Sequence, residues 1–186
     1  MDNTKITNKS RIQVQESPIS IFLFSDTRFS IVWLILRLYI GYQWMVAALD
    51  KLNQSTWIGK EAGVALKGFI QGAIKNSGGI HPNVSQWYAW FLMHIVLPHV
   101  ITFSYLVTYG ELFVGITLIL GLFTGIAAFF GSFMNMNYLF AGAVSINPIM
   151  FLIELFIILA WRTAGWIGLD RILLPILGTP WKKQIQ

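Results

Sequence analysis

The chain has 186 residues, of which 55% are hydrophobic and only 11% are charged, and its formal net charge is +5. An ordinary soluble domain carries roughly 25% charged residues, so the composition excludes that class and predicts an integral membrane protein. The small positive charge fits contact with anionic lipid headgroups and gives no reason to expect a nucleic-acid partner.

The first predicted elements are a polar cytoplasmic tail, residues 1–28, and a membrane span over about residues 29–49. The tail lacks the early apolar core and small-residue cleavage site of a signal peptide, so we expect the span to stay attached. This span is long enough to cross the hydrocarbon core and contains one charged residue, Arg37.

A long outer loop, about residues 50–99, contains an amphipathic helix that we expect to lie along the membrane surface. One face has apolar residues at helical spacing and the other is polar: Ala62, Ala65, Leu66, Phe69, Ile70, Ala73 and Ile74 against Lys60, Lys67, Gln71 and Lys75. Further on, Trp87, Tyr88 and Trp90 predict an aromatic belt, and Pro98 predicts a bend into the next helix. The loop is either a simple cap on the bundle or a lid beside a lipid-soluble ligand.

The remaining chain predicts three more spans and a short C-terminal tail. The spans cover about residues 100–120, 122–143 and 149–166, and the tail covers residues 178–186. Glu111 lies in the second span and Glu154 in the fourth. The predicted fold class is therefore all-α: a polytopic four-transmembrane-helix bundle over residues 29–177.

The distribution of basic residues predicts that both termini of this cell-membrane protein are cytoplasmic. With four spans the two termini share a side, and that side has more lysine and arginine than the outer loop. The residues are Lys5, Lys9, Arg11, Arg28, Arg162, Arg171, Lys182 and Lys183 on the side of the termini, and Lys51, Lys60, Lys67 and Lys75 in the loop.

Depth in the membrane predicts which buried polar residues meet. Counted from the cytoplasmic end of each span at 1.5 Å per residue, Arg37 lies ~12 Å deep and Glu111 ~14 Å, so the two are predicted to pair. A lone charge near the midplane costs at least about 2.5 kcal/mol. Glu154 lies at ~18 to 22 Å with neutral amides and no cation at its level, which makes it the sharper candidate for a carboxyl that changes protonation.

The buried polar residues have two interpretations. Arg37 and Glu111 form only a structural ion pair, or they belong to a functional polar centre. The other residues of such a centre are Tyr42, Gln43, Asn135, Asn137, Tyr138 and Glu154. Residues i and i+2 lie about 200° apart on a helix, so Asn135 and Asn137 face different ways and one of them is expected to bond a neighbouring helix. Gly115, Gly121 and the other glycines of these spans predict close helix packing.

Several kinds of site have no support in the sequence. There is no cysteine, which excludes disulfides and thiolate ligands. His94 and His99 have no clustered carboxylates to complete a ligand set, so no metal site is predicted. Phosphate-binding loops, zincin motifs and nucleophile elbows are also missing from the sequence.

Several motifs occur in order along the chain: LRLYIGYQW, ALDKL, GELFVGITLILGLFTG, MNMNYLFAG and WRTAGWIGLDR. Together they resemble the DoxX/DoxD family of small four-helix membrane proteins over about residues 33–175. The resemblance assigns Arg37, Lys51 and Glu111 to the family's charged pattern. The family takes its name from subunits of a thiosulfate:quinone oxidoreductase.

The resemblance implies a membrane subunit of a quinone-linked oxidoreductase, with thiosulfate as a candidate electron donor. In this hypothesis Glu111 or Glu154 relays protons and Arg37 holds a quinone carbonyl. The expected substrate-binding residues are Lys51, which attracts the anion, with Tyr42, Gln43, Asn135 and Asn137. The sequence has no visible haem, flavin or iron–sulfur ligand set, so either a redox partner supplies electrons or the substrate reacts directly with the quinone.

Two alternatives from other classes stay open at this point. The same buried charges would suit a small ion or solute transporter. A non-catalytic membrane anchor of a redox complex would need them only for folding. Exposed glycine faces would also allow a homodimer.

Overall fold

The structure is a computed structural model that describes residues 16–178. The predicted tail residues 1–15 and 179–186, with five of the eight basic residues assigned to the side of the termini, lie outside the described part. Helices dominate residues 16–178 and no strand occurs among them, so the predicted all-α class is confirmed.

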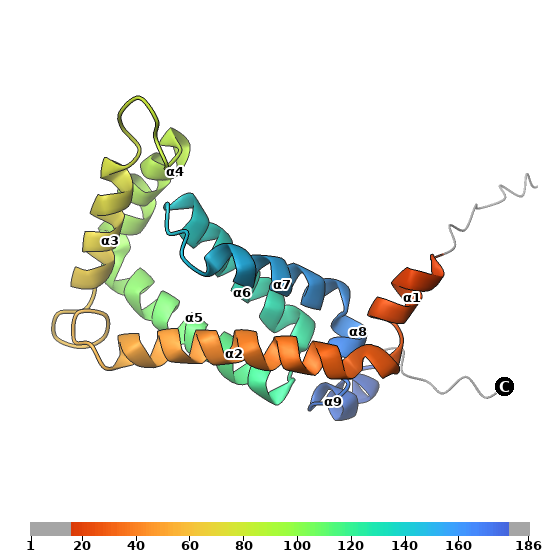
Figure 1. The fold of residues 1–186 in the computed structure, drawn as a ribbon. Coiled ribbons are helices and arrows are strands. Elements are labelled where there is room, and N and C mark those ends of the chain that lie inside the picture. The colour runs from red at the N-terminus through yellow and green to blue at the C-terminus, as the bar shows by residue number, and fades with distance from the viewer. Residues whose placement is uncertain (1–15, 179–186) are drawn as a thin grey trace, which may run out of the picture.

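Four long helices lie side by side and form the body of the molecule (Figure 1). They are α2 (Ser30–Leu52), α5 (Val100–Leu120), α6 (Thr124–Phe140) and α7 (Asn147–Leu159). The principal packed pairs are α2 with α5 and α6 with α7. In the first pair the backbones come close, because a Cβ on Gly115 would lie 2.9 Å from the backbone nitrogen of Met45. The predicted packing role of Gly115 is therefore confirmed.

Shorter helices close the two ends of the body (Figure 1). At one end, called the α3–α4 end below, lie α3 (Val64–Lys75) and α4 (Gln86–Phe91). At the other, called the α8–α9 end, lie α1 (Pro18–Phe24), α8 (Trp161–Ala164) and α9 (Asp170–Ile176). Part of the predicted N-terminal tail is thus helical and packed, since the indole of Trp33 donates to the carbonyl of Leu23 at 2.8 Å.

The amphipathic helix of the long loop forms where the sequence predicts it. Leu66, Ile70 and Ala73 of α3 are buried, while its lysines and Gln71 are exposed. The buried face packs against a cluster that includes Tyr88 and Leu92. Hydrophobic burial therefore fixes α3 across the end of the bundle.

The predicted bend at Pro98 coincides with a break in regular helix geometry. Between α4 and α5 the chain forms a π-helical segment, Leu92–Val96, and a 3₁₀ turn, Leu97–His99. Pro98 lies in this turn because it has no N–H to donate to an α-helical carbonyl. Trp87 and Trp90 of α4 are exposed, as expected of interfacial aromatics, but Tyr88 is buried.

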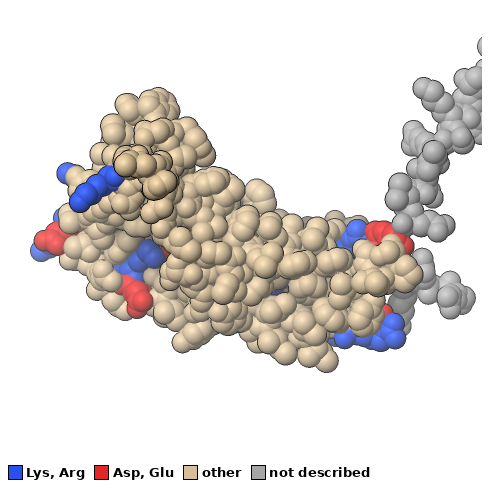
Figure 2. Space-filling view, turned by 45° about the horizontal axis from the view of Figure 1, so that its top comes forward, with Lys and Arg blue, Asp and Glu red and all other residues tan. Residues whose placement is uncertain are grey.

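The surface of the body is apolar, as expected of helices that meet lipid. Exposed side chains include Ile35 on α2, Leu106 on α5 and Phe133 on α6. Figure 2 shows the charged side chains gathered towards the two ends, with an almost uncharged surface between them. By length and composition two helical segments could each cross a membrane, Thr27–Leu52 and Gln86–Leu120. A third apolar helix, α7, has 13 residues and spans about 20 Å.

Candidate functional site

Three helices bring Lys51, Glu111 and Tyr138 together near the α3–α4 end. The ammonium of Lys51, in the last turn of α2, donates to both carboxylate oxygens of Glu111, at 2.9 and 2.7 Å. The hydroxyl of Tyr138, on α6, donates to the same carboxylate at 2.5 Å. Glu111 is buried, with 1% of its side chain exposed, whereas 16% of the Lys51 side chain is exposed. The carboxylate is thus held by three charge-assisted hydrogen bonds.

The predicted pair of Arg37 and Glu111 is wrong. The contact of Gly115 with Met45 places Glu111, which lies one turn before Gly115 in α5, level with the residues just before Lys51 in α2. Arg37 lies eight residues before Met45, so it is level with the end of α5, about 18 Å from Glu111 along the bundle. The prediction assumed that the helices end at one depth, but α2 continues past the end of α5.

Arg37 instead binds the polypeptide backbone at the α8–α9 end. Its guanidinium donates to the carbonyls of Ala164 at 3.1 Å and Ile167 at 2.7 Å. Gly121 ends α5 in the left-handed conformation, and a Cβ there would collide with the guanidinium. Arg37 is buried, and its position gives it a structural role that joins α2 to the segment after α7.

Asp170 completes this structural cluster, and the sequence analysis did not single it out. Its carboxylate accepts from the backbone N–H groups of Phe123 at 2.5 Å and Thr124 at 2.8 Å, which begin α6. Its own N–H donates to the carbonyl of Gly121 at 2.8 Å. A carboxylate at a helix N-terminus is favoured by the free N–H groups and the helix dipole. The motif WRTAGWIGLDR contained this residue, but the spacing alone did not connect it to a helix start 46 positions earlier.

Glu154 forms a second buried polar centre inside the bundle. The indole of Trp44 donates to one carboxylate oxygen at 2.6 Å, and the amide of Asn135 donates to the other at 2.7 Å. Both donors are neutral, as predicted, and Asn135 is among the predicted amide partners. A Cβ on Gly131 would collide with the carboxylate, so the glycine makes room for it. Trp44 was missed because a tryptophan in an apolar helix gives no sign of which way its N–H points.

The two asparagines face different ways, as predicted. Asn135 is buried against Glu154, while Asn137 accepts a hydrogen bond from the hydroxyl of Tyr88 at 3.1 Å. The same hydroxyl lies 3.0 Å from the carbonyl of Asn137. The amide of Asn137 donates to the carbonyl of Phe133 at 2.8 Å. Asn137 therefore links α6 to α4, and Asn135 links α6 to α7.

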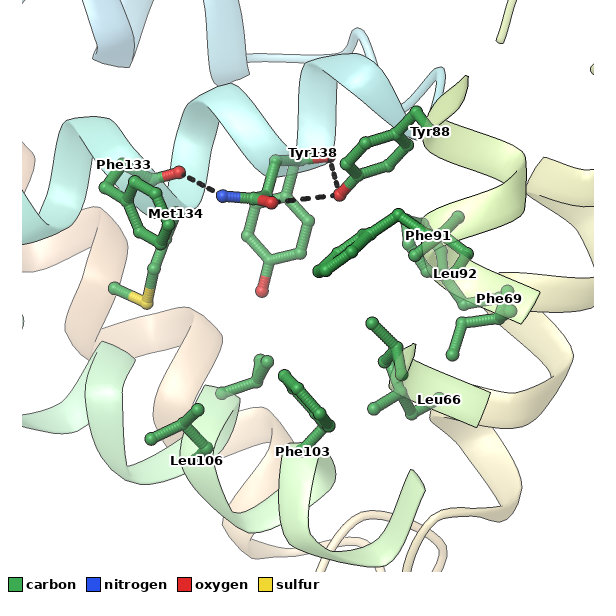
Figure 3. Close-up of a pocket in the computed structure, with 14 residues that line it drawn as sticks. Leu66, Phe69, Tyr88, Phe91, Leu92, Phe103, Leu106, Phe133, Met134 and Tyr138 are labelled. Atoms are coloured by element: carbon green, nitrogen blue, oxygen red, sulfur yellow. Dashed lines mark hydrogen bonds between the residues drawn. The ribbon is translucent and has the colours of Figure 1, made fainter. Parts of the chain in front are cut away.

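An apolar cavity of about 210 Å³ lies beneath α3, between α4, α5 and α6. Its walls are mainly aromatic and aliphatic (Figure 3): Leu66, Phe69, Phe91, Leu92, Phe103, Leu106, Phe133 and Met134. Tyr88, Asn137 and Tyr138 contribute the polar atoms. This space is called the apolar cavity below, and Asn137 is the predicted binding residue that reaches it.

A second cavity, of about 400 Å³, lies on the other side of Tyr138 and is called the Lys51 cavity. Its lining is more polar and includes Lys51, Glu111, Asp50, Gln43 and Asn147. The ammonium of Lys51 also lies 5.0 Å from the centre of the Trp57 ring. Two of the predicted site residues, Lys51 and Glu111, therefore share a cavity with the predicted Gln43.

The remaining predicted residues do not reach either cavity. Arg37 and Glu154 are enclosed by their own hydrogen-bond partners. Tyr42 is 62% exposed on the outer surface of α2. The structure thus separates the predicted polar centre into a cavity-lining group, Lys51 and Glu111 with Tyr138, and two enclosed groups around Arg37 and Glu154.

The apolar surface, the surface charges gathered at the two ends and the buried contact of Lys51 with Glu111 are those of a helical membrane protein with cavities between its helices. Within that class the family is shown by comparison with known proteins: a model of the DoxX family matches residues 32–143. The chain belongs to the DoxX family. Searches of curated proteins and of solved structures found no match.

Proposed function

We propose that this protein is the quinone-binding membrane subunit of an oxidoreductase complex, with α2, α5, α6 and α7 all crossing the cell membrane and the termini in the cytoplasm. The observation that carries the proposal is the apolar cavity, which lies at the α3–α4 end of the bundle beneath the amphipathic helix α3. Membership of the DoxX family supports a link to membrane oxidoreductases.

The size of the apolar cavity favours a head group and not a whole lipid. Its volume of about 210 Å³ is below the roughly 300 Å³ of a typical small-molecule site. A single substituted ring would fill the cavity, so the isoprenoid tail of a quinone would have to extend out of it. Leu106 and Phe133 line the cavity and expose 62% and 51% of their surfaces, so an exit to lipid lies between α5 and α6.

The chemistry of the walls also fits a flat ring with two carbonyl oxygens. Phe69, Phe91 and Phe103 supply aromatic faces and edges that pack against such a ring. The hydroxyls of Tyr88 and Tyr138 lie at the cavity wall and donate to Asn137 and Glu111, and a ring carbonyl would be bound by rotation of one of these O–H groups towards the cavity. A bound quinone would supply the two-electron redox chemistry that the side chains lack, and the protein would bind the ring, exclude water and provide protons.

The electrons come, in this proposal, from a partner subunit that oxidises a small reductant such as thiosulfate. Lys51 does not serve as a free site for that anion, because its charge is matched by Glu111 and Asp50 lines the same cavity. A dianion would meet no excess of positive charge there. The binding of the reductant is therefore assigned to the partner and not to the Lys51 cavity.

Lipid extraction and mass analysis of the purified protein test the proposal. The expected result is a quinone that co-purifies with the wild-type protein and is lost in Leu66→Trp, which fills the apolar cavity. Leu152→Trp is the matched control, since Leu152 lies exposed on α7, and it should retain the quinone. Absence of quinone from wild-type protein taken from quinone-containing membranes, together with uptake of a solute by reconstituted protein, would favour the transporter instead. Absence of both would favour a non-catalytic anchor.

A further inference from the structure

We propose that Lys51, Glu111 and Tyr138 form a proton path that leads from the Lys51 cavity to a ligand in the apolar cavity. The inference rests on the proposed function, because it names how protons reach a quinone ring bound there. It assigns Tyr138 as the group that gives the proton to the ligand. It also assigns the Lys51 cavity, at the α3–α4 end, as the side from which protons are taken.

The first observation is that the two cavities share a wall. Tyr138 and Phe69 line both of them. Their rings meet edge to face with centres 6.2 Å apart. Figure 3 shows the Tyr138 hydroxyl directed towards the middle of the side chains that surround the apolar cavity. Of these two residues in the shared wall, Tyr138 has a hydroxyl proton to exchange and Phe69 has none.

The second observation is an unbroken chain of hydrogen bonds on the Lys51 side of the wall. The Tyr138 hydroxyl donates to Glu111 at 2.5 Å, and the Lys51 ammonium donates to the same carboxylate at 2.7 and 2.9 Å. Every neighbouring pair is thus within the distance needed for direct proton transfer. Glu111 is 1% exposed, and its carboxylate accepts hydrogen bonds from Lys51 on one side and Tyr138 on the other.

The third observation is that the outer end of the chain is accessible. Lys51 retains 16% exposure, and the exposed Asp50 lines the same cavity. Gln43 and Asn147 add further polar atoms to the lining. A cavity of about 400 Å³ with these polar groups in its lining is large enough for several waters. Protons therefore have a hydrated entrance on this side and an apolar space on the other.

The proton transfers balance as follows. When two electrons from the partner's reductant reach the bound ring, the Tyr138 hydroxyl turns from Glu111 to a ring oxygen, its O–H bond breaks and a new O–H bond forms on that oxygen. Tyr138 recovers a proton from the Glu111 carboxyl, which has taken one from the Lys51 ammonium. Lys51 takes its proton from water in the Lys51 cavity. One such passage protonates the ring oxygen beside Tyr138. The second proton of the quinol is supplied in the same way once the ring has turned its other oxygen towards Tyr138.

The charged and titratable groups around Glu111 in the Lys51 cavity come from α2 and α6. From α2 these are Lys51 and Asp50, and from α6 the group is Tyr138. The lining contributed by α3 and α7 is neutral, namely Phe69, Asn147 and Met150. Glu154 lies apart, bonded to Trp44 and Asn135.

Removing one hydroxyl tests the path. In nanodiscs, the full chain is saturated with a short-chain benzoquinone and reduced with the methyl viologen radical cation, an electron donor that releases no protons, and proton uptake is followed with a pH dye. Tyr138→Phe should bind the probe within twofold of wild type and take up protons about 100-fold more slowly, the lower range for a positioned acid. Tyr109→Phe is the control, because Tyr109 lies half exposed on α5 outside both cavities and should behave as wild type.

A blocked entrance gives a second test that leaves the path residues intact. The chain has no cysteine, so Ala143→Cys places a single thiol in the lining of the Lys51 cavity. Modification with a bulky methanethiosulfonate reagent should slow proton uptake, and the unmodified variant should not differ from wild type. Val64→Cys, exposed on α3 outside the cavities, is the matched control.

The outcomes separate the inference from the proposed function. Normal probe binding with normal proton uptake in Tyr138→Phe and in blocked Ala143→Cys would overturn the proton path and leave the quinone site standing. If Tyr138→Phe does not fold, the blocked cysteine decides alone. Failure of the wild-type protein to bind the probe would overturn both.

Discussion

Replacement of Lys51 by methionine distinguishes the ion pair in the structure, Lys51 with Glu111, from the pair that depth predicted, Arg37 with Glu111. Methionine keeps most of the length of the side chain but removes the ammonium that donates to Glu111 at 2.7 and 2.9 Å. Glu111, 1% exposed, would then keep only its bond from Tyr138. Breaking a buried pair in this way leaves a carboxylate without a cation.

The expected loss in free energy of unfolding for Lys51→Met is about 3 to 5 kcal/mol, the usual effect of removing one partner of a buried pair. Partial exposure of Lys51 favours the lower end of this range, because solvent screens part of the interaction. Glu111→Gln added to Lys51→Met removes the stranded charge. The double variant should therefore regain about 2 kcal/mol relative to the sum of the single changes.

Titration of the protein from mild detergent into sodium dodecyl sulfate, followed by circular dichroism, measures these free energies. The comparison cycle uses Arg37→Gln with Glu111→Gln. The backbone levels of these two residues differ by about 18 Å along the bundle, so the two changes should be additive within about 0.5 kcal/mol. Strong coupling of Arg37 with Glu111, together with additive Lys51 and Glu111 changes, would refute the assignment of the pair.

Three further predictions use the same unfolding measurement. Gly131→Ala should lower stability by about 1 to 3 kcal/mol, because its Cβ would overlap the Glu154 carboxylate. Gly68→Ala in α3 is the control, since its Cβ would meet nothing within 4 Å. This change should raise the free energy of unfolding by as much as about 1 kcal/mol. Equal effects would contradict the packing account. Asp170→Asn should cost about 1 to 2 kcal/mol, because an amide offers one acceptor where Phe123 and Thr124 need two. Asp26→Asn, at an exposed turn, should lower the free energy of unfolding by less. A larger loss for Asp26→Asn than for Asp170→Asn would count against the role of Asp170 at the start of α6. Glu154→Gln should stay within about 1 kcal/mol of wild type, because its oxygen can accept from Trp44 and its amide can donate to Asn135 after that amide turns over. Glu154→Leu leaves both donors unpaired and should cost at least about 2 kcal/mol. A tolerated leucine would show that the buried bonds contribute little.

The sequence predicted the helical class and the amphipathic helix of the loop, because both depend on the periodicity of apolar residues. Leu66 and Ile70 fall on the buried face of α3 as their spacing required. The second span was predicted at residues 100–120 and α5 has these bounds, since Pro98 and Gly121 mark its ends. The fourth predicted span, 149–166, is interrupted at Ala160, where α7 ends and the short α8 begins.

The pairing of buried charges could not be predicted from depth alone. Depth counted from helix ends requires the ends to be level, and the packing of Gly115 on Met45 shows that α2 and α5 are offset. Lys51 was predicted in the outer loop, but it lies in the last turn of α2 and its long side chain reaches inward to Glu111. Flexible cationic side chains move their charge by several ångströms from the backbone position, and a sequence does not give the direction.

The candidate site was only partly predictable for a similar reason. Residues with charges were identified because charge is rare in this chain, and Lys51 and Glu111 do line a cavity. The apolar cavity depends on the space left between Phe69, Phe91 and Phe103, which come from three separate segments. Such a space is a property of the packing and has no motif in the sequence.

Photoaffinity labelling with an azido-substituted benzoquinone tests the central claim most directly. After irradiation in nanodiscs and digestion, the quinone site predicts label on peptides from α4, α5 and α6 that contain Phe91, Phe103 or Met134, and loss of that label in Leu66→Trp. Excess unlabelled short-chain quinone should compete. Label spread over lipid-exposed residues such as Ile35 and Leu152, unaffected by the competitor or by Leu66→Trp, would contradict the account.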